Sequence, residues 1–444
     1  MPVMKAPRVV LVALFFLSSS LAFAEAVKDR EGAVRQDKAT MENDARWAYN
    51  DLDRGFAEAK RTGKPLLAVL RCVPCLSCAG IDASVLTEPQ LTPLLDKFVC
   101  VRVINANALD LSLFQFDYDL SFSALFLNGD GTIYGRFGSW VHQKNQHEKS
   151  TASFKRALEG ALDLHRNFPA NKTALAGKRG PALPYKTPVN IPALSSKYRL
   201  ELDWNGKVVP SCVHCHQIGD ALRVVHRRNK EPMPNDLIYP MPAPETVGFT
   251  LAQDSAARVE SVNVDSPAAK AGFQVGDEIV SLAGQPLISI ADVSWVLHRS
   301  PESGSVSAVV KRAGVDKPLS LDLPAGWRTS SDISRRAGTW GMRGMASGGL
   351  VLEDLPDDAR ASRGLKTGEM ALLVKMVGEY GKHAAAKKAG FQKDDVIVEM
   401  AGLSRRLTEG ELIGELLRAH PAGENVKAVV MRGQQRVELT MPMQ

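Results

Sequence analysis

The sequence is poor in cysteine and nearly balanced in charge. Its 444 residues include only six cysteines, and 55 basic residues against 49 acidic ones leave a formal net charge of +6. So few cysteines exclude a small disulfide-stapled scaffold. A surplus this small, spread over the whole chain, does not make the concentrated basic face that nucleic acid requires. We therefore expect no nucleic-acid partner.

Several catalytic and membrane patterns are also missing. The sequence contains no Gly-x-Ser-x-Gly turn, no His-Glu-x-x-His motif and no Walker phosphate loop, which carry the nucleophile, metal or nucleotide of large enzyme classes. We therefore expect neither a serine protease nor a metalloprotease domain. The apolar run Val9 to Leu17 is far shorter than the roughly 20 residues of a membrane helix, so we expect no membrane span in the mature chain.

The length of the chain suffices for about three domains, and 45% apolar with 23% charged residues is ordinary for folded proteins. Residues 1–24 form a separate segment, in which Lys5 and Arg8 precede the apolar run and small residues end it at Ala24. This three-part pattern predicts a signal peptide. The mature protein is therefore expected in the periplasm or otherwise exported, where disulfides are permitted.

Residues 40–166 have the order of elements of an α/β layer fold. The apolar run Leu66–Leu70 is typical of a buried strand and is followed directly by a cysteine cluster. Further apolar runs lie at 98–104 and 124–127, and an amphipathic helix is predicted over Ser153–Phe168. The segment resembles the exported thioredoxin-like family through Trp47, Lys64-Pro65, a Cys-x-x-Cys spacing and Asp130-Gly131.

In that family the first cysteine of the pair lies where a strand ends and a helix begins, so that the helix dipole stabilises its thiolate. The resemblance implies a catalytic dithiol at Cys75 and Cys78, with Cys72 as an extra thiol or as the alternative partner of Cys75. However, no proline stands near residues 121–123, where the family has a cis-proline that keeps metal away from the pair. The three cysteines therefore perform dithiol exchange, form a structural disulfide or bind a metal or cofactor.

A second cysteine motif, Cys-x-x-Cys-His, occupies residues 212–216. It follows residues 167–196, whose Pro, Gly, Lys and Thr content predicts an extended linker, and lies within a segment of residues 197–246. Two thiols at this spacing can form thioethers with both vinyl groups of a haem while the adjacent histidine reaches the iron. The motif resembles the attachment site of c-type cytochromes and implies one covalent haem c on Cys212 and Cys215, with His216 on the iron. A zinc site or a disulfide is the alternative.

Three residues downstream are candidates for the distal ligand of that iron: His226, Met233 and Met241. Five prolines between residues 232 and 244 predict an extended loop that could lie across a haem face. Met233 and Met241 are equally suited to plain packing roles.

The C-terminal part of the chain contains a duplication. Residues 271–274 (AGFQ) recur at 389–392, an offset of 118 positions, and each copy combines short β-rich runs with one helix. Residues 265–279 resemble bacterial PDZ domains of exported proteases and secretion factors. The resemblance implies two β-rich α+β PDZ domains, at 247–327 and 338–444.

In PDZ domains a turn of backbone N–H groups holds a peptide carboxylate, and the peptide adds a strand to the sheet edge. The matching residues are Gly248, Phe249, Thr250 and Leu251 in the first copy and, by spacing, Gly364 and Leu365 in the second. The expected partners are C-termini of exported proteins or peptides. A purely structural role as an intramolecular brace is the alternative.

Together these features predict a multidomain protein: an α/β thioredoxin-like domain, a small irregular haem-binding segment and two PDZ domains. The leading hypothesis is an exported redox protein in which the haem transfers electrons, the thiols exchange disulfides with a redox partner and the PDZ domains dock peptides. If the chain is an enzyme on this hypothesis, it is a thiol-disulfide oxidoreductase. The alternative is a non-catalytic PDZ adaptor or scaffold whose thioredoxin-like domain is degenerate.

Overall fold

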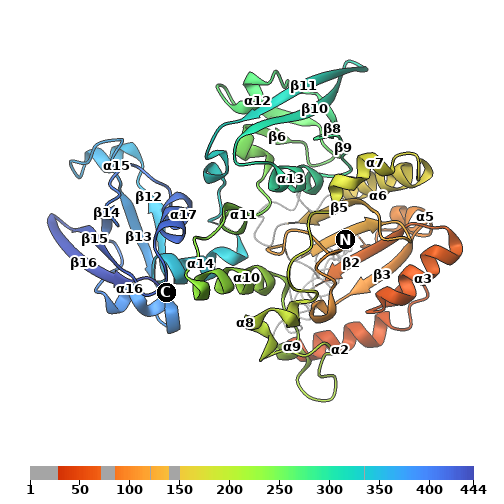
Figure 1. Cartoon of the computed structure of the whole chain (residues 1–444), viewed down its shortest axis with the longest axis horizontal. Helices are drawn as coiled ribbons and strands as arrows, with labels where there is room; N and C mark the ends of the chain where they lie inside the picture. The colour runs from red at the N-terminus through yellow and green to blue at the C-terminus, as the bar shows by residue number, and fades with distance from the viewer. Residues whose placement is uncertain (1–28, 72–85, 121, 140–150, 335) are drawn as a thin grey trace, which may run out of the picture.

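The computed structural model describes residues 29–71, 86–120, 122–139, 151–334 and 336–444 (Figure 1). Three bodies, each with a β-sheet, are joined by a helical segment that crosses the middle of the molecule. We call them the N-terminal unit, the central unit and the C-terminal unit. The expected multidomain organisation is confirmed, and the three cysteines of the first motif lie outside the described residues.

The N-terminal unit is built on a five-stranded sheet in the order β1-β3-β2-β4-β5. Strands β1, β3 and β2 are parallel, while β4 and β5 are antiparallel to their neighbours. Because β5 is last in the strand order, it forms one edge of the sheet. The strands are β1 (Trp47–Tyr49), β2 (Leu66–Arg71), β3 (Val99–Val103), β4 (Phe122–Leu127) and β5 (Ile133–Ser139).

Helices cover both faces of this sheet, which explains why all six residues of β2 are buried. Alternate side chains of a strand point to opposite faces. Leu66 and Ala68 therefore pack with Ala59 of α3, and Leu67 packs with Phe154 of α6. The helices of the unit are α2 (Arg30–Met41), α3 (Leu52–Thr62), α5 (Thr92–Leu95) and α6 (Thr151–Arg166).

Short helices follow the N-terminal unit, and one long helix, α10 (Cys215–Asn229), runs between the N-terminal and C-terminal units (Figure 1). The extended linker expected at residues 167–196 is instead folded against the protein. Ile191 and Leu194 are buried with Ile218 of α10, and Lys178 is fully buried. Composition alone suggested an extended linker because the apolar residues of this segment have no regular period. The short helices are α7 (Lys172–Leu175), α8 (Pro192–Ser195), α9 (Val208–Ser211) and α11 (Asn235–Ile238).

The central unit contains two small sheets around one apolar core. One sheet has the order β11-β10-β8-β9, and the other pairs β6 with β7. Helix α13 closes the core through buried residues such as Val293 and Leu297. The elements are β6 (Phe249–Leu251), β7 (Val259–Val262), α12 (Pro267–Lys270), β8 (Glu278–Leu282), β9 (Gln285–Pro286), α13 (Ile290–Arg299), β10 (Gly304–Arg312) and β11 (Val315–Leu323).

The C-terminal unit repeats this plan with one continuous sheet, β12-β13-β14-β15-β16. An additional helix, α14, precedes its first strand. The elements are α14 (Ala337–Ala346), β12 (Leu350–Asp354), α15 (Asp357–Ala361), β13 (Leu372–Val377), α16 (Ala385–Lys388), β14 (Val396–Met400), α17 (Glu409–Ala419), β15 (Asn425–Arg432) and β16 (Gln435–Pro442).

The two units share one polar network at the repeated sequence. In the central unit, Arg312 Nε donates to Asp277 Oδ1 at 2.7 Å and its Nη2 donates to Gly272 O at 2.8 Å. In the C-terminal unit, Arg432 makes both contacts at 2.8 Å with Asp395 and Gly390. The same ion pair therefore fastens the glycine turn to the penultimate strand in both units.

Among the described helices, none combines the length and the apolar character that a membrane crossing would require.

Candidate functional site

The candidate site is a groove between β6 and α13 of the central unit. Gly248, directly before β6, has a φ of +96°, and a Cβ atom there would lie 2.1 Å from Cβ of Ser266. Both facts require glycine at this position. The predicted residues Gly248, Phe249, Thr250 and Leu251 thus form a tight turn and the short strand β6 that follows it.

One edge of β6 has no strand partner among the described residues, because its sheet contains only β6 and β7. Gly248 O accepts the Asn263 N–H at 2.8 Å, and Ala252 N donates to Arg258 O at 2.8 Å. In an antiparallel ladder such pairs alternate with residues whose backbone groups point the other way. The N–H and C=O groups of Phe249 and Leu251 therefore face α13 rather than β7.

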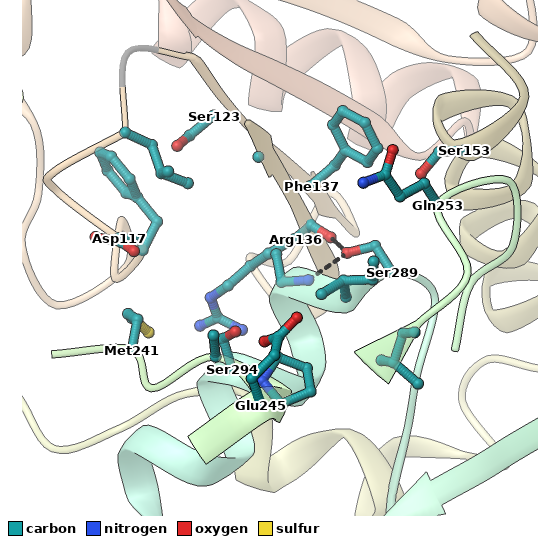
Figure 2. Close-up of a pocket in the computed structure, with 18 residues that line it drawn as sticks. Asp117, Ser123, Arg136, Phe137, Ser153, Met241, Glu245, Gln253, Ser289 and Ser294 are labelled. Atoms are coloured by element: carbon teal, nitrogen blue, oxygen red, sulfur yellow. Dashed lines mark hydrogen bonds between the residues drawn. The ribbon is translucent and has the colours of Figure 1, made fainter. Parts of the chain in front are cut away.

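A cavity of about 180 Å³ lies along this groove. One wall is the segment from Met241 to Gln253, which includes Leu251, and a second wall is the first turns of α13, with Ile290 and Ser294. The third wall comes from the N-terminal unit and includes Arg136 of β5, whose side chain extends towards Ser294 in Figure 2. The groove thus lies between two units of the chain.

The start of α13 is fixed directly to β5. Ser289, the N-cap of α13, donates its hydroxyl to Arg136 O at 2.5 Å, as Figure 2 shows, and Asp292 accepts the Arg136 N–H at 3.1 Å. The other carboxylate oxygen of Asp292 lies 3.0 Å from Nζ of Lys178. These buried contacts hold one wall of the groove at a set position against the N-terminal unit.

A second polar cluster joins the N-terminal unit to the start of α14. Arg336 donates to Asp117 at 2.5 Å and to Asp119 at 2.8 Å. Burial raises the pKa of Asp117 to about 6, whereas Arg336 and Arg223 hold the pKa of Asp119 below its usual value against the effect of burial. The Met241 N–H donates to Nδ1 of His298, on α13, at 3.4 Å. Burial and nearby arginines lower the pKa of His298 to about 3.

The corresponding edge in the C-terminal unit is occupied by the chain itself. The turn before β12 contains Gly348 and Gly349, both at positive φ, and the Gly349 N–H donates to Arg343 O at the end of α14 at 2.9 Å. The Leu352 N–H, which faces α17, donates to Glu409 Oε1 at 2.8 Å. Glu409 is held in turn by Arg343 Nη2 at 2.6 Å.

The structure therefore places the second turn elsewhere than expected. Gly364 and Leu365 lie after α15, in an insert between β12 and β13, and Leu365 packs against a small apolar cluster with Leu355. Spacing from the shared sequence suggested them because this insert lengthens the connection between the first two strands. By topology the equivalent residues are Gly348, Gly349 and Leu350.

The two thiols of the motif at 212–216 pack against different apolar clusters. The Cys212 thiol donates to Ile104 O at 3.4 Å and packs with Val208, and burial raises its pKa to about 11. Cys215 packs against a different cluster, which contains Phe114. Neither sulfur lines the cavity along the groove. With protein side chains packed against each sulfur, the residues as arranged do not fit a covalently attached haem.

The proposed iron ligands are also apart. His216 and His226 are both on α10, ten positions apart, which corresponds to about 15 Å along a helix axis. Axial ligands of one iron would be roughly 4 Å apart, given metal–ligand bonds of about 2 Å. Met233 lies in the core of the C-terminal unit and Met241 in that of the central unit. Among the described residues, no group of three or more His, Cys, Asp or Glu could hold a metal ion.

The sites predicted at Cys72, Cys75 and Cys78 lie outside the described residues, and their roles stay predictions. The remaining cysteine, Cys100 on β3, is buried in the apolar core, and burial raises its pKa to about 12. It is an inert packing residue.

Sequence analysis missed the contribution of Arg136 and the occupation of the second edge by α14. Both depend on contacts between residues far apart in the chain. A weak indication was present for the second: residues 348–349 are two consecutive glycines directly before an apolar run, as at a tight turn entering a strand.

Comparisons with known proteins match two parts of the chain to families. Residues 47–129 match a thioredoxin-like family, and residues 258–312 match the PDZ domain family. The thioredoxin-like and first PDZ assignments are confirmed.

Curated relatives are periplasmic proteases. The chain is 28% identical over 184 residues to a probable periplasmic serine endoprotease DegP-like of Pseudomonas fluorescens, covering 41% of this chain and 37% of the relative. It is 30% identical over 194 residues to the periplasmic pH-dependent serine endoprotease DegQ of Escherichia coli, covering 44% and 38%. The chain thus spans little more than a third of these relatives. Among solved structures, the HtrA-type protease AlgW with a decapeptide overlaps 31% of this chain at 17% identity and a TM-score of 0.20.

These findings correct the functional hypotheses. The similarity to periplasmic serine endoproteases, together with the PDZ match of residues 258–312, contradicts both the haem electron-transfer protein and the non-catalytic adaptor. The expectation that the chain holds neither a serine protease nor a metalloprotease domain stays a prediction, because the matches cover only 37% and 38% of these relatives. The expected exported location is confirmed, since the curated relatives are periplasmic.

Proposed function

We propose that this exported protein acts in proteolysis in the periplasm by binding polypeptide C-termini in the groove between β6 and α13. The observation that carries the proposal is the outward-facing backbone of Phe249 and Leu251 beside a cavity. A peptide added there as a strand would pair with these groups while its side chains enter the cavity. The match of residues 258–312 to the PDZ domain family and the similarity to periplasmic serine endoproteases support the same role.

We assign the C-terminal unit to the PDZ fold as well, on the strength of the duplicated Arg–Asp network and the matching order of elements. Its edge is filled by Arg343 O and Glu409. Peptide binding is therefore assigned to the central unit, and the C-terminal unit is a closed copy of it.

The names of the curated relatives favour a second candidate function, hydrolysis of the bound polypeptide. His298 lies on α13, one wall of the groove, and burial lowers its pKa to about 3, so it is a poor general base at neutral pH. A casein-cleavage assay with and without a serine-directed phosphonate decides whether the chain itself hydrolyses peptides. Cleavage that the phosphonate abolishes would assign hydrolysis to this chain.

Binding is tested by fluorescence anisotropy of labelled hexapeptides with free C-termini. Ser294→Trp places a large side chain in the groove, whereas Ser305→Trp makes the same change at an exposed position of β10 in the same unit. We expect Ser294→Trp to weaken binding more than about tenfold, as filling a pocket removes several buried contacts, and Ser305→Trp to leave it unchanged. Equal binding by both variants, or no binding by the unaltered chain, would refute the proposal.

A further inference from the structure

The further inference concerns Arg136 and rests on the proposed function of the groove. Arg136 belongs to β5 of the N-terminal unit, yet it lines the cavity of the central unit (Figure 2). Its residue is only 2% exposed. In a buried arginine, each N–H donor is expected to have a hydrogen-bond partner.

Arg136 has one donor that is not satisfied. Its Nε donates to Gln115 O and its Nη2 to Lys178 O, both at 2.6 Å, and the guanidinium lies 3.8 Å from the ring centroid of Trp295. These contacts fix the orientation of the guanidinium plane. Nη1 has no hydrogen-bond partner among the described residues, and Asp292 Oδ1 is 4.0 Å from it, beyond hydrogen-bond distance.

The buried charges beside Arg136 leave an excess of positive charge. Arg136 and Lys178 share one carboxylate, Asp292, and all three residues are at most 2% exposed. Burial lowers the pKa of Arg136 to about 10 and lowers that of Lys178, which reflects how incompletely one carboxylate compensates two cations. An anion that enters the cavity would restore the balance.

Two carboxylates, those of Asp117 and Glu245, line the cavity. Asp117 is bound by Arg336, and Glu245 lies on the exposed side of the groove at the 3₁₀ turn before β6. Neither forms an ion pair with Arg136 in the described residues, so Nη1 has no carboxylate within hydrogen-bond distance.

We propose that Arg136 selects peptides that carry an acidic side chain, whose carboxylate accepts the Nη1–H bond. The C-terminal carboxylate of the same peptide lies at the Gly248 turn. The N-terminal unit then serves as a specificity element of the groove, and acidic peptides are its ligand class.

The test uses the full chain and hexapeptides that differ at single positions, Glu against Gln, each with a free or an amidated C-terminus. We expect one position at which Glu binds about tenfold tighter than Gln, the usual gain for a hydrogen bond to a charged group, whether or not the C-terminus is amidated. Equal affinity of the Glu and Gln peptides at every position would overturn the inference while leaving the proposed function intact. Loss of the difference on amidation alone would assign the charge to the C-terminal carboxylate and overturn it too.

Variants of the protein provide a second arm. Arg136→Gln should abolish the preference and Arg136→Lys should retain part of it, because lysine keeps the charge but not the planar fork. Arg328→Lys is the matched control, since Arg328 is also buried, lies 4.6 Å from the Trp327 ring and does not line the cavity. A preference that survives in a folded Arg136→Gln variant would contradict the inference. Absence of binding by any peptide would remove the proposed function and this inference with it.

Discussion

Replacing Glu409 by alanine should destabilise the C-terminal unit strongly. Its carboxylate accepts Arg343 Nε at 2.9 Å, Arg343 Nη2 at 2.6 Å and the Leu352 N–H at 2.8 Å, and the residue is 6% exposed. Removing one partner of a buried ion pair costs about 3–5 kcal/mol, which includes leaving the other charge unpaired. We expect a loss of free energy of unfolding in this range, with Glu409→Gln losing less because it keeps an acceptor.

Hydrogen exchange of residues 337–354 during mild urea titration measures the free energy of opening of this unit separately from that of the other two units. A two-state unfolding curve of the whole chain would not separate them. The paired replacement Arg343→Met with Glu409→Leu removes both charges and should recover most of the loss. A loss below about 1 kcal/mol in Glu409→Ala, or a paired variant no more stable than the single one, would refute the role assigned to this contact.

Three further predictions follow from single sites. Burial lowers the pKa of His298 to about 3 from 6.5 in the unfolded chain, so the free energy of unfolding should fall as pH drops from 6.5 towards 3, by up to about 1.4 kcal/mol per pH unit. His298→Gln should flatten this part of the pH profile. An unchanged profile would contradict the burial of a neutral imidazole. Gly248→Ala should lower the free energy of unfolding by about 2–5 kcal/mol, the sum of left-handed strain and overpacking against Ser266. The control Gly314→Ala changes a glycine that also has positive φ but has open space around it, and it should lower the free energy of unfolding by only about 1–2 kcal/mol. Equal melting temperatures of the two variants would show that the clash is absent. Intact mass of protein from a host that matures cytochromes c should match the bare processed chain, and an added haem mass would show that residues 212–216 adopt another arrangement.

Local pattern was sufficient for much of the fold. The apolar run Leu66–Leu70 became β2 because a strand covered on both faces needs apolar residues at every position. The duplicated AGFQ sequence identified two similar units, since in each it forms the turn that the Arg–Asp pair fastens. Such features depend on neighbours within one element or one turn.

Features that depend on distant residues were not predictable. Arg136 reads as an ordinary residue of an edge strand, and only the packing of α13 on β5 makes it part of a groove in another unit. The Cys-x-x-Cys-His motif predicted a haem from spacing alone, but whether both thiols face one space is decided by the surrounding clusters. In the same way, the sequence gives no indication that Glu409 reaches the edge of β12.

The most direct test of peptide binding at β6 is hydrogen exchange of the intact protein with and without a saturating peptide that has a free C-terminus. If the peptide adds as a strand, the amides of Phe249 and Leu251 become hydrogen-bonded and their exchange slows, while the amide of Leu352, already bonded to Glu409, does not change. Protection confined to β12, or no change at β6 with peptide bound, would contradict the account.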